Sequence, residues 1–370
     1  MTAYFPAPGD AWEKIEPQSA GLDPSRLDEA VAFAIEAESP MNRNIQEALD
    51  EGHFSEPPPL GDIIGPTRDR GDPHGLVIKG GRIVAEWGDP SSVDMTFSAA
   101  KSYLSICAGL AHDEGLIPDF DAPIADLVDD GGFEPPHNSQ ITWRHLLQQT
   151  SEWEGELWSK PDMIDRNRVL GAKPGADVTK GTFRALQTPG TFWEYNDVRV
   201  NRLALALLRV WRRPLPEVIR ERVMDPIGCS DTWEWHGYRN SWVEIDGEQM
   251  QSVSGGAHWG GGIFINSFDH ARVGLLMLNR GRWGDRQILS EDYVNQALTP
   301  CPLQKDYGFM WWLNTGNTHA PSAPESSFFA RGVGVNWVWC EPKNDMVAVV
   351  RWIDGDRTDG FCKRLMAAVT

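Results

Sequence analysis

Two residues three positions apart, Ser98 and Lys101, form the pattern in this chain that could do chemistry. They stand in the run Phe97-Ser98-Ala99-Ala100-Lys101, where we expect a helix to begin. Residues three apart on a helix project from one face, so the lysine nitrogen would lie near the serine hydroxyl. A serine is a poor nucleophile until a neighbour takes its proton, and a lysine that burial keeps neutral can take it. A capped helix with a solvated lysine explains the same residues, so the pattern needs support from the rest of the chain.

A second candidate segment, residues 188–197, ends in Tyr195-Asn196-Asp197 and precedes an amphipathic helical pattern. A tyrosine held near a lysine can relay protons. A tyrosine on a loop, with Asp197 as the N-cap of the following helix, explains the same residues structurally. Both interpretations can hold together.

Strand and helix patterns at the two ends of the chain indicate which elements position these residues. Asp23 followed by Pro24 predicts the start of a first helix, and Gly80-Gly81 predicts the turn of a hairpin spanning residues 76–87. Residues 39–73 are rich in Pro, Gly and charge, which predicts a long ordered loop. Near the end of the chain, the patterns predict two strands over 337–341 and 346–352 and a last helix over about 359–368.

The middle of the chain, from about residue 105 to about 255, is dominated by helical patterns. Strands at both ends with a helical middle predict an α+β fold, in which helices flank an antiparallel sheet built from both termini. We expect one catalytic domain over 1–370 with two lobes. An α/β lobe would comprise 1–104 and about 256–370, and a mainly helical lobe about 105–255. A cleft between the lobes would be the default place for a site.

Composition narrows the functional classes. The formal net charge of -19 over 370 residues argues against nucleic acid and anionic membrane surfaces as partners. The sequence shows no signal peptide and no apolar run long enough to cross a bilayer, so we expect a cytoplasmic protein. The five cysteines are scattered without zinc spacing, which predicts reduced thiols. The nine histidines do not cluster either, and His258, within a glycine-rich run, favours a structural or substrate-lining role over metal binding. We therefore expect no metal and no cofactor.

The chain resembles the class C β-lactamase superfamily of serine hydrolases, which includes DD-peptidases, esterases and 6-aminohexanoate-dimer hydrolases. Four segments carry the resemblance in the family's order, namely residues 97–101, 141–151, 189–197 and 260–278. The resemblance implies a β-lactamase/DD-peptidase-like fold. It also implies that Ser98 is the acylated nucleophile, that Lys101 activates it and that Tyr195 relays protons to the leaving group and from the deacylating water.

Two departures from the family's motifs bear on this expectation. The family's Tyr-x-Asn reads Tyr195-Asn196-Asp197, with aspartate where the amide is expected. We place Asn196 and Asp197 among the supporting residues. An aspartate can bond Lys101, but it cannot donate to a substrate carbonyl, and it favours the charged lysine, which weakens that lysine as a base.

The second departure concerns the motif that usually reads Lys-Thr-Gly or His-x-Gly, which we place at Ala330-Arg331-Gly332. This register implies an oxyanion hole made by the backbone N–H groups of Ser98 and Val333, with Gly332 permitting close approach to the substrate. Arg331 could bind a substrate carboxylate or could be a solvated strand residue. The loss of Lys or His there weakens the case for β-lactamase or DD-peptidase activity.

Seventeen tryptophans are a heavy count for this length. Several lie in segments expected around the cleft, where aromatic walls would favour hydrophobic acyl or amide chains, although any one of them is better explained by core packing. From this set, Trp153 and Trp259 are our candidates for substrate contact. The set comprises Trp153, Trp158, Trp193, Trp259, Trp311 and Trp312.

The leading functional hypothesis is a cytoplasmic serine hydrolase that cleaves a small-molecule ester or amide through an acyl-enzyme. Alternatives are an acyltransferase, a D-amino-acid-type peptidase, a β-lactamase, and a non-catalytic binding protein on this fold. An α/β-hydrolase is disfavoured because no Gly-x-Ser-x-Gly appears, and a dinucleotide enzyme because no strand leads into Gly-x-Gly-x-x-Gly. The sequence leaves open whether the chain forms a homo-oligomer.

Overall fold

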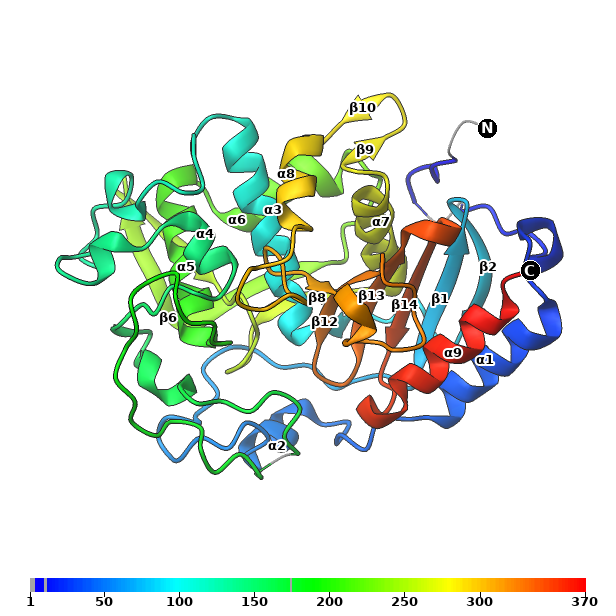
Figure 1. The fold of residues 1–370 in the computed structure, drawn as a ribbon, viewed down its shortest axis with the longest axis horizontal. Helices are drawn as coiled ribbons and strands as arrows, with labels where there is room; N and C mark the ends of the chain where they lie inside the picture. Colours follow the sequence, from blue (N-terminus) through cyan, green and yellow to red (C-terminus); the bar gives the residue numbers. More distant parts are fainter. Residues whose placement is uncertain (1–3, 10–11, 174) are drawn as a thin grey trace.

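Strands from both ends of the chain pair in one six-stranded antiparallel sheet (Figure 1). The computed structural model describes residues 4–9, 12–173 and 175–370. The strand order is β11-β12-β13-β14-β1-β2. The predicted α+β fold, with a sheet built from both termini, is therefore confirmed. The strands are β1 (His74–Lys79), β2 (Arg82–Trp87), β11 (Trp312–Leu313), β12 (Phe328–Gly332), β13 (Asn336–Glu341) and β14 (Met346–Arg351).

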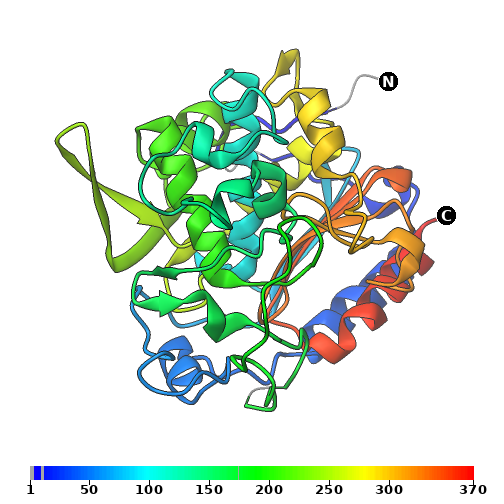
Figure 2. The ribbon, with the colours of Figure 1, turned by 60° about the vertical axis from the view of Figure 1, so that its left-hand side comes forward.

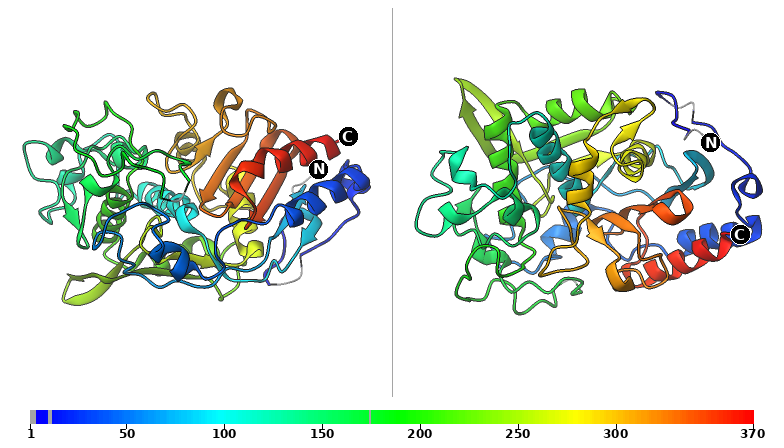
Figure 3. Two further views of the ribbon diagram at one scale, coloured as in Figure 1. Left: turned by 90° about the horizontal axis from the view of Figure 1, so that it is seen from below. Right: turned by 45° about the horizontal axis from the view of Figure 1, so that its top comes forward.

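Helices cover both faces of this sheet. Alternate residues of β13 face opposite layers: Trp337 and Trp339 pack in the cluster beneath the first and last helices, whereas Val338 and Cys340 pack toward α7. The first and last helices lie side by side on the outer face (Figure 3). The first helix begins where the sequence predicted, because Asp23 caps it, and the last begins within one residue of the predicted start. The helices on the outer face are α1 (Pro24–Glu36) and α9 (Thr358–Ala368), and the helix on the other face is α7 (Ser267–Leu278).

A second antiparallel sheet, in the order β3-β8-β6-β7, lies beneath the helical part of the chain. Two of its strands form a long hairpin that projects from the body in Figure 2. The segment 105–255 is therefore less helical than predicted, because it contains this hairpin and a long irregular stretch over 148–196. The elements are β3 (Asp94–Met95), β6 (Glu234–Ile245), β7 (Glu248–Val253), β8 (Gly262–Ile265), α3 (Ala100–Asp113), α4 (Trp143–Leu147), α5 (Asp197–Trp211) and α6 (Leu215–Ile219).

The predicted loop over residues 39–73 contains a short helix, α2 (Ile45–Asp50), which the sequence reading missed. Asn44 caps it by accepting a hydrogen bond from the Glu47 N–H. Across the ranges that the structure describes, no helix is both long and apolar enough to span a bilayer. The remaining elements are α8 (Glu291–Ala297), the pairs β4 (Glu156–Leu157) with β5 (Lys160–Pro161) and β9 (Arg282–Trp283) with β10 (Arg286–Gln287), and short helical turns at 17–20, 97–99, 124–126, 138–140, 162–165, 220–224, 315–317, 342–344 and 355–357.

Candidate active site

Ser98 lies in a single 3₁₀ turn, Phe97–Ala99, that runs directly into α3. The turn is fixed to β8, because both the N–H and the hydroxyl of Thr96 donate to the Ile263 carbonyl at 2.9 Å. Phe97, buried and immediately before the serine, has φ of 48°, a left-handed conformation that non-glycine residues rarely adopt. Such strain persists only where the surroundings hold it, and it is common at functional sites.

Lys101 reaches back along α3 to the serine, as the three-residue spacing predicted. Its Nζ lies 2.8 Å from Ser98 Oγ and 2.5 Å from Asp197 Oδ1. The lysine side chain is 1 % exposed, whereas Ser98 remains half-buried and accessible. Gly256 packs directly on the contact between Lys101 and Asp197, so closely that any side chain there would displace one of them.

Tyr195 completes the group, and its ring is held between three neighbours. Lys101 Nζ lies 4.6 Å from the ring centroid and the Arg168 guanidinium carbon 5.5 Å from it. Trp312 stacks on the same ring, with the two centroids 5.7 Å apart. The structure therefore brings together Ser98, Lys101 and Tyr195, the three residues that the sequence singled out.

The residue that caps α5 is Asn196, not Asp197 as predicted. The Asn196 side chain accepts from the N–H groups of Val198 and Arg199, and its amide donates to the Asp162 carbonyl at 2.9 Å. All of its polar atoms are therefore engaged in holding the backbone. Asp197 becomes the first residue of α5, which leaves its carboxylate free to face Lys101.

Three cationic or protonatable side chains surround the Asp197 carboxylate. Besides Lys101 on Oδ1, Oδ2 accepts from Arg168 Nη1 at 2.6 Å and lies 3.0 Å from His258 Nδ1. Burial would raise the pKa of Asp197, but Lys101, His258 and Arg168 outweigh burial and hold that pKa well below its ordinary value. Asp197 is therefore ionised at neutral pH.

A buried network continues from His258 away from the nucleophile. His258 Nε2 contacts Glu56, which also contacts the Lys180 ammonium, and Lys180 reaches Asp165 at 3.1 Å. One ligand atom each from Glu56, Asp165 and His258 lies within 4.8 Å of the others, a spacing that could suit a metal. The Lys180 nitrogen, however, contacts all three side chains and supplies the positive charge between them. We therefore describe this cluster as an ion-pair network.

Sequence reasoning missed most of this network. Glu56, Arg168 and Lys180 come from two irregular loops whose sequences show no periodicity and no motif, and no signal in the sequence marked them. His258 alone had drawn attention, through the glycine-rich run around it. The structure places its two ring nitrogens against Asp197 and Glu56, and the structural or substrate-lining role expected for it stays a prediction.

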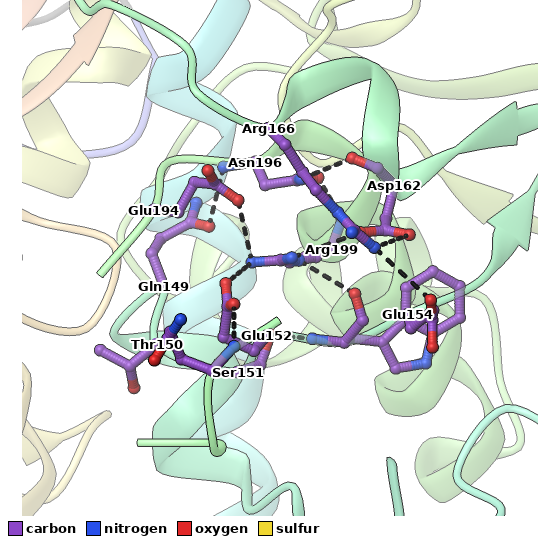
Figure 4. A network of polar contacts seen from close by, with 12 residues as sticks. Gln149, Thr150, Ser151, Glu152, Glu154, Asp162, Arg166, Glu194, Asn196 and Arg199 are labelled. Atoms are coloured by element: carbon purple, nitrogen blue, oxygen red, sulfur yellow. Dashed lines mark hydrogen bonds and ion pairs between the residues drawn. The ribbon is translucent and has the colours of Figure 1, made fainter. Parts of the chain in front are cut away.

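A second buried network fixes the start of α5 and the loop that precedes it (Figure 4). Arg199 stands at its centre, with its guanidinium nitrogens 2.7 Å from Glu152, 3.3 Å from Glu194 and 3.3 Å from Asp162. The Gln149 side chain accepts from the Asn196 N–H at 3.2 Å. These bonds join the loop after α4 to the segment that carries Tyr195 and Asp197. The orientation of Tyr195 and Asp197 therefore depends on this network.

The end of β12 lies against the turn that carries the nucleophile. A Cβ on Gly332 would lie 3.0 Å from the Thr96 carbonyl carbon and 3.2 Å from the Ala99 nitrogen, and closer still to the Thr96 oxygen. The turn that follows, residues 333–335, is held by Asn336, whose amide donates to the Val333 carbonyl at 2.6 Å. The buried Arg351 in turn binds Asn336 and donates to the Met95 carbonyl at 3.2 Å.

Arg331, on the same strand, is packed among aromatic rings. Its guanidinium carbon lies 4.4 Å from the ring centroid of Trp337 and 5.7 Å from that of Trp312, and its Nη1 bonds the His319 ring. Burial lowers the pKa of Arg331 to about 10. It is thus not the fully solvated strand residue that one interpretation predicted.

The tryptophans divide between core and site. Trp153 and Trp259, our candidates for substrate contact, are 3 % and 0 % exposed and belong to the main hydrophobic core. This burial supports the core-packing explanation for both. Of the other four, Trp312 is half-buried and stacks on Tyr195, and Trp193 packs against Tyr195 with centroids 6.3 Å apart. Trp311 is buried in the core, and Trp158 is half-buried against the core.

Comparisons with known proteins agree with this fold. A curated relative from Escherichia coli O157:H7, provisionally designated a D-alanyl-D-alanine carboxypeptidase, is 25 % identical in an alignment of 163 residues. The match covers 36 % of this chain and 38 % of the relative. The chain thus spans well under half the length of that relative.

Two solved structures cover nearly the whole chain. A provisionally designated 6-aminohexanoate-dimer hydrolase from Bacillus anthracis superposes with a TM-score of 0.55 at 16 % identity, over 94 % of this chain and 92 % of its own. EstCE1, a hydrolase with promiscuous acyltransferase activity, superposes with a TM-score of 0.57 at 16 % identity, over 93 % and 99 %. Identities this low establish the fold alone. The sequence itself matches the model of the Beta-lactamase family over residues 75–360, and the chain therefore belongs to the Beta-lactamase family.

Proposed function

We propose that this protein is a serine hydrolase that cleaves a small ester or amide through an acyl-enzyme on Ser98. The observation that carries the proposal is the 2.8 Å separation of Lys101 Nζ and Ser98 Oγ, with the lysine buried and the serine accessible. A neutral amine at this distance can accept the hydroxyl proton as Oγ attacks a carbonyl carbon. General-base assistance of this kind contributes about 10²–10⁴-fold.

In this proposal, two backbone N–H groups stabilise the oxyanion that forms when Ser98 attacks. Ser98 supplies one from the turn before α3, and Val333 supplies the other from the turn after β12. The close packing of Gly332 on the Thr96 carbonyl supports this register. Each donor of this type is worth roughly 2.7–4 kcal/mol of barrier.

Tyr195 is proposed to pass the proton from Lys101 to the leaving group. Its ring stacks on Trp312 and lies beneath the lysine nitrogen, so the side chain has little freedom to leave the site. In the second half of the reaction the same pair would take a proton from water, which then attacks the acyl carbon and releases Ser98.

The direct test is labelling with a fluorophosphonate probe, together with turnover of p-nitrophenyl esters of increasing chain length. Ser98→Ala should abolish both. Ser102→Ala is the matched control, because Ser102 lies in the first turn of α3, close after Ser98 in the sequence, and its buried hydroxyl instead donates to the Met310 carbonyl at 2.8 Å. Ester turnover by a folded Ser98→Ala variant would refute the proposed nucleophile, and failure of the wild-type protein to label would favour a non-catalytic role.

Acyl transfer is a second candidate reaction, because an alcohol or amine can replace water as the acceptor of the same acyl group. EstCE1, which shares this fold, has promiscuous acyltransferase activity. Adding a short alcohol to the ester assay distinguishes the two reactions. Transfer predicts a faster release of p-nitrophenol where deacylation limits turnover, with formation of the new ester, whereas strict hydrolysis predicts only the free acid.

A further inference from the structure

The aspartate at position 197 poses an electrostatic problem for the proposed mechanism, on which this inference rests. A carboxylate 2.5 Å from Lys101 favours the ammonium form of the lysine, and an ammonium cannot accept the Ser98 proton. An uncompensated Asp197 would therefore oppose the base. Other positive groups surround this carboxylate. Counting them against the buried carboxylates shows whether Asp197 can be balanced without a charge on Lys101.

The buried cluster contains three carboxylates, those of Asp197, Asp165 and Glu56. Two cations besides Lys101 belong to the cluster. They are the guanidinium of Arg168, which is always charged, and the ammonium of Lys180, which binds Glu56 and Asp165. The side chain of Arg168 is 12 % exposed, and those of the other members are at most 4 % exposed. Without a further cation, three negative charges would face two positive ones.

The geometry assigns the third positive charge to the imidazole of His258. Its Nδ1 faces Asp197 Oδ2 at 3.0 Å and its Nε2 contacts the Glu56 carboxylate, so both ring nitrogens face acceptors. Only an imidazole with a proton on each nitrogen can donate to both carboxylates. Lys180 Nζ lies 3.2 Å from Nε2 because both donors converge on the same Glu56 oxygen. Phe54 stacks on the imidazole at 4.0 Å between centroids and excludes water from that side.

Three positive groups then balance three carboxylates without Lys101. A proton on Lys101 would give the cluster an unbalanced charge in a site with little water, which is costly. The other titratable groups that face this region add no negative charge. Burial lowers the pKa of the neighbouring His53 to about 4 and raises that of Tyr307, so both are neutral, and Arg331 beyond Tyr195 is a further cation.

We propose that Arg168, together with His258, is a positioning residue that compensates the charge of Asp197 and thereby allows Lys101 to lose its proton and to deprotonate Ser98 as a neutral amine. Arg168 holds Oδ2 while Lys101 holds Oδ1, so one carboxylate orients the lysine nitrogen toward Ser98 without fixing a proton on it. In this arrangement Asp197 no longer prevents Lys101 from acting as a base.

The test is the pH dependence of kcat/KM for a p-nitrophenyl ester, with the pH dependence of fluorophosphonate labelling as a substrate-independent readout. Arg168→Met should move the midpoint of the acidic limb upward by about one pH unit or more, because a charge within about 4–6 Å shifts a titration by 1–3 units. Arg168→Lys should restore most of the wild-type midpoint. Arg202→Met is the matched control, because Arg202 is also a buried arginine but pairs with Asp130, outside both networks, so its loss should leave the midpoint unmoved.

The double variant Arg168→Met/Asp197→Asn separates charge from structure. It removes one charge of each sign, so its acidic limb should return toward the wild-type pH even if its maximal rate is lower. An unmoved limb in folded Arg168→Met, or a double variant that stays at the shifted pH, would overturn the inference. If Arg168→Met does not fold, the double variant and Arg168→Lys decide in the same way. Labelling and turnover that depend on Ser98 would still stand in those cases, so the proposed function fails only with the Ser98→Ala test.

Discussion

Replacing Gly332 by alanine tests whether the end of β12 must touch the turn that carries Ser98. The added Cβ would lie 3.0 Å from the carbonyl carbon of Thr96 and 3.2 Å from the nitrogen of Ala99, and closer still to the Thr96 oxygen. Carbon atoms in contact sit at about 3.5–4.0 Å. The strand end and the turn must therefore separate by roughly 1 Å, since these neighbours are backbone atoms and not flexible side chains.

We expect this separation to lower kcat strongly and the free energy of unfolding only moderately. A displacement of about 1 Å in a reacting geometry can lower the rate about 10²-fold, and full loss of one oxyanion donor costs about 10²–10³-fold in kcat. Overpacking of this kind costs roughly 1–3 kcal/mol of unfolding free energy, which a domain of this size tolerates. We therefore expect Gly332→Ala to fold, with kcat about 10²-fold lower and KM changed much less.

The assay is kcat and KM for a p-nitrophenyl ester, the rate of fluorophosphonate labelling and a thermal unfolding curve. Gly355→Ala is the matched control, because a Cβ on Gly355 would meet no heavy atom within 4 Å. Wild-type kcat in a folded Gly332→Ala variant would refute both the register of this strand and the place of Val333 in the oxyanion hole. An equal loss in Gly355→Ala would show that the effect is not local to the site.

The remaining predictions concern single side chains. Lys101→Ala and Tyr195→Phe should each lower kcat severely, and the double variant should be only slightly slower than the slower single variant; additive losses in kcat would show that the two act independently. Arg331→Ala should raise KM for esters with an acidic acyl group and leave KM for neutral esters unchanged. The wild-type enzyme should turn over a chromogenic cephalosporin far more slowly than its best ester. Equal kcat/KM values for the cephalosporin and that ester would contradict this last expectation. Burial would raise the pKa of Glu152, but hydrogen bonds and charge from Arg184 and Arg199 hold this pKa at about 2, below its ordinary value of 4.5. Its contribution to stability is therefore complete above about pH 4.5 and is lost as the pH falls toward 2, so urea unfolding should show a larger deficit for Glu152→Gln at pH 6 than at pH 3.

Local signals predicted the elements whose residues interact with near neighbours. Asp23 and Pro24 marked the start of α1 because capping and a fixed φ act within one turn, and Gly80-Gly81 marked a hairpin because both residues adopt positive φ. The same locality placed Lys101 beside Ser98, one helical turn away. Weaker local signals misled: α2 is only six residues long within a segment rich in Pro and Gly, and the part of the chain predicted to be mainly helical, about 105–255, also contains the paired strands β6 and β7.

The surroundings of the candidate site could not be predicted, because they depend on contacts between distant segments. Glu56 meets His258 across 202 positions, and Arg168 meets Asp197 across 29, from loops with no periodic pattern. The exchange of Asn196 and Asp197 as N-cap has a similar cause. Either residue can cap a helix, and the choice falls to Asn196, since its amide also binds the Asp162 carbonyl while Asp197 binds Lys101.

Three arginines explain how short segments hold this site together: Arg351 and Arg199 are buried, and the side chain of Arg168 is 12 % exposed. Arg351 joins the turn after β12 to β3 and β8, Arg199 joins the loop after α4 to α5, and Arg168 joins an irregular loop to Asp197. Apolar packing does not fix the direction of a bond, whereas a planar guanidinium with five donors fixes two or three partners at once. Ser98, Tyr195 and the turn that carries Val333 lie on different segments, and these arginines set their relative orientation. Burying an arginine is costly unless its donors are used, and the donors of these three bind acceptors on the segments that carry or support the site.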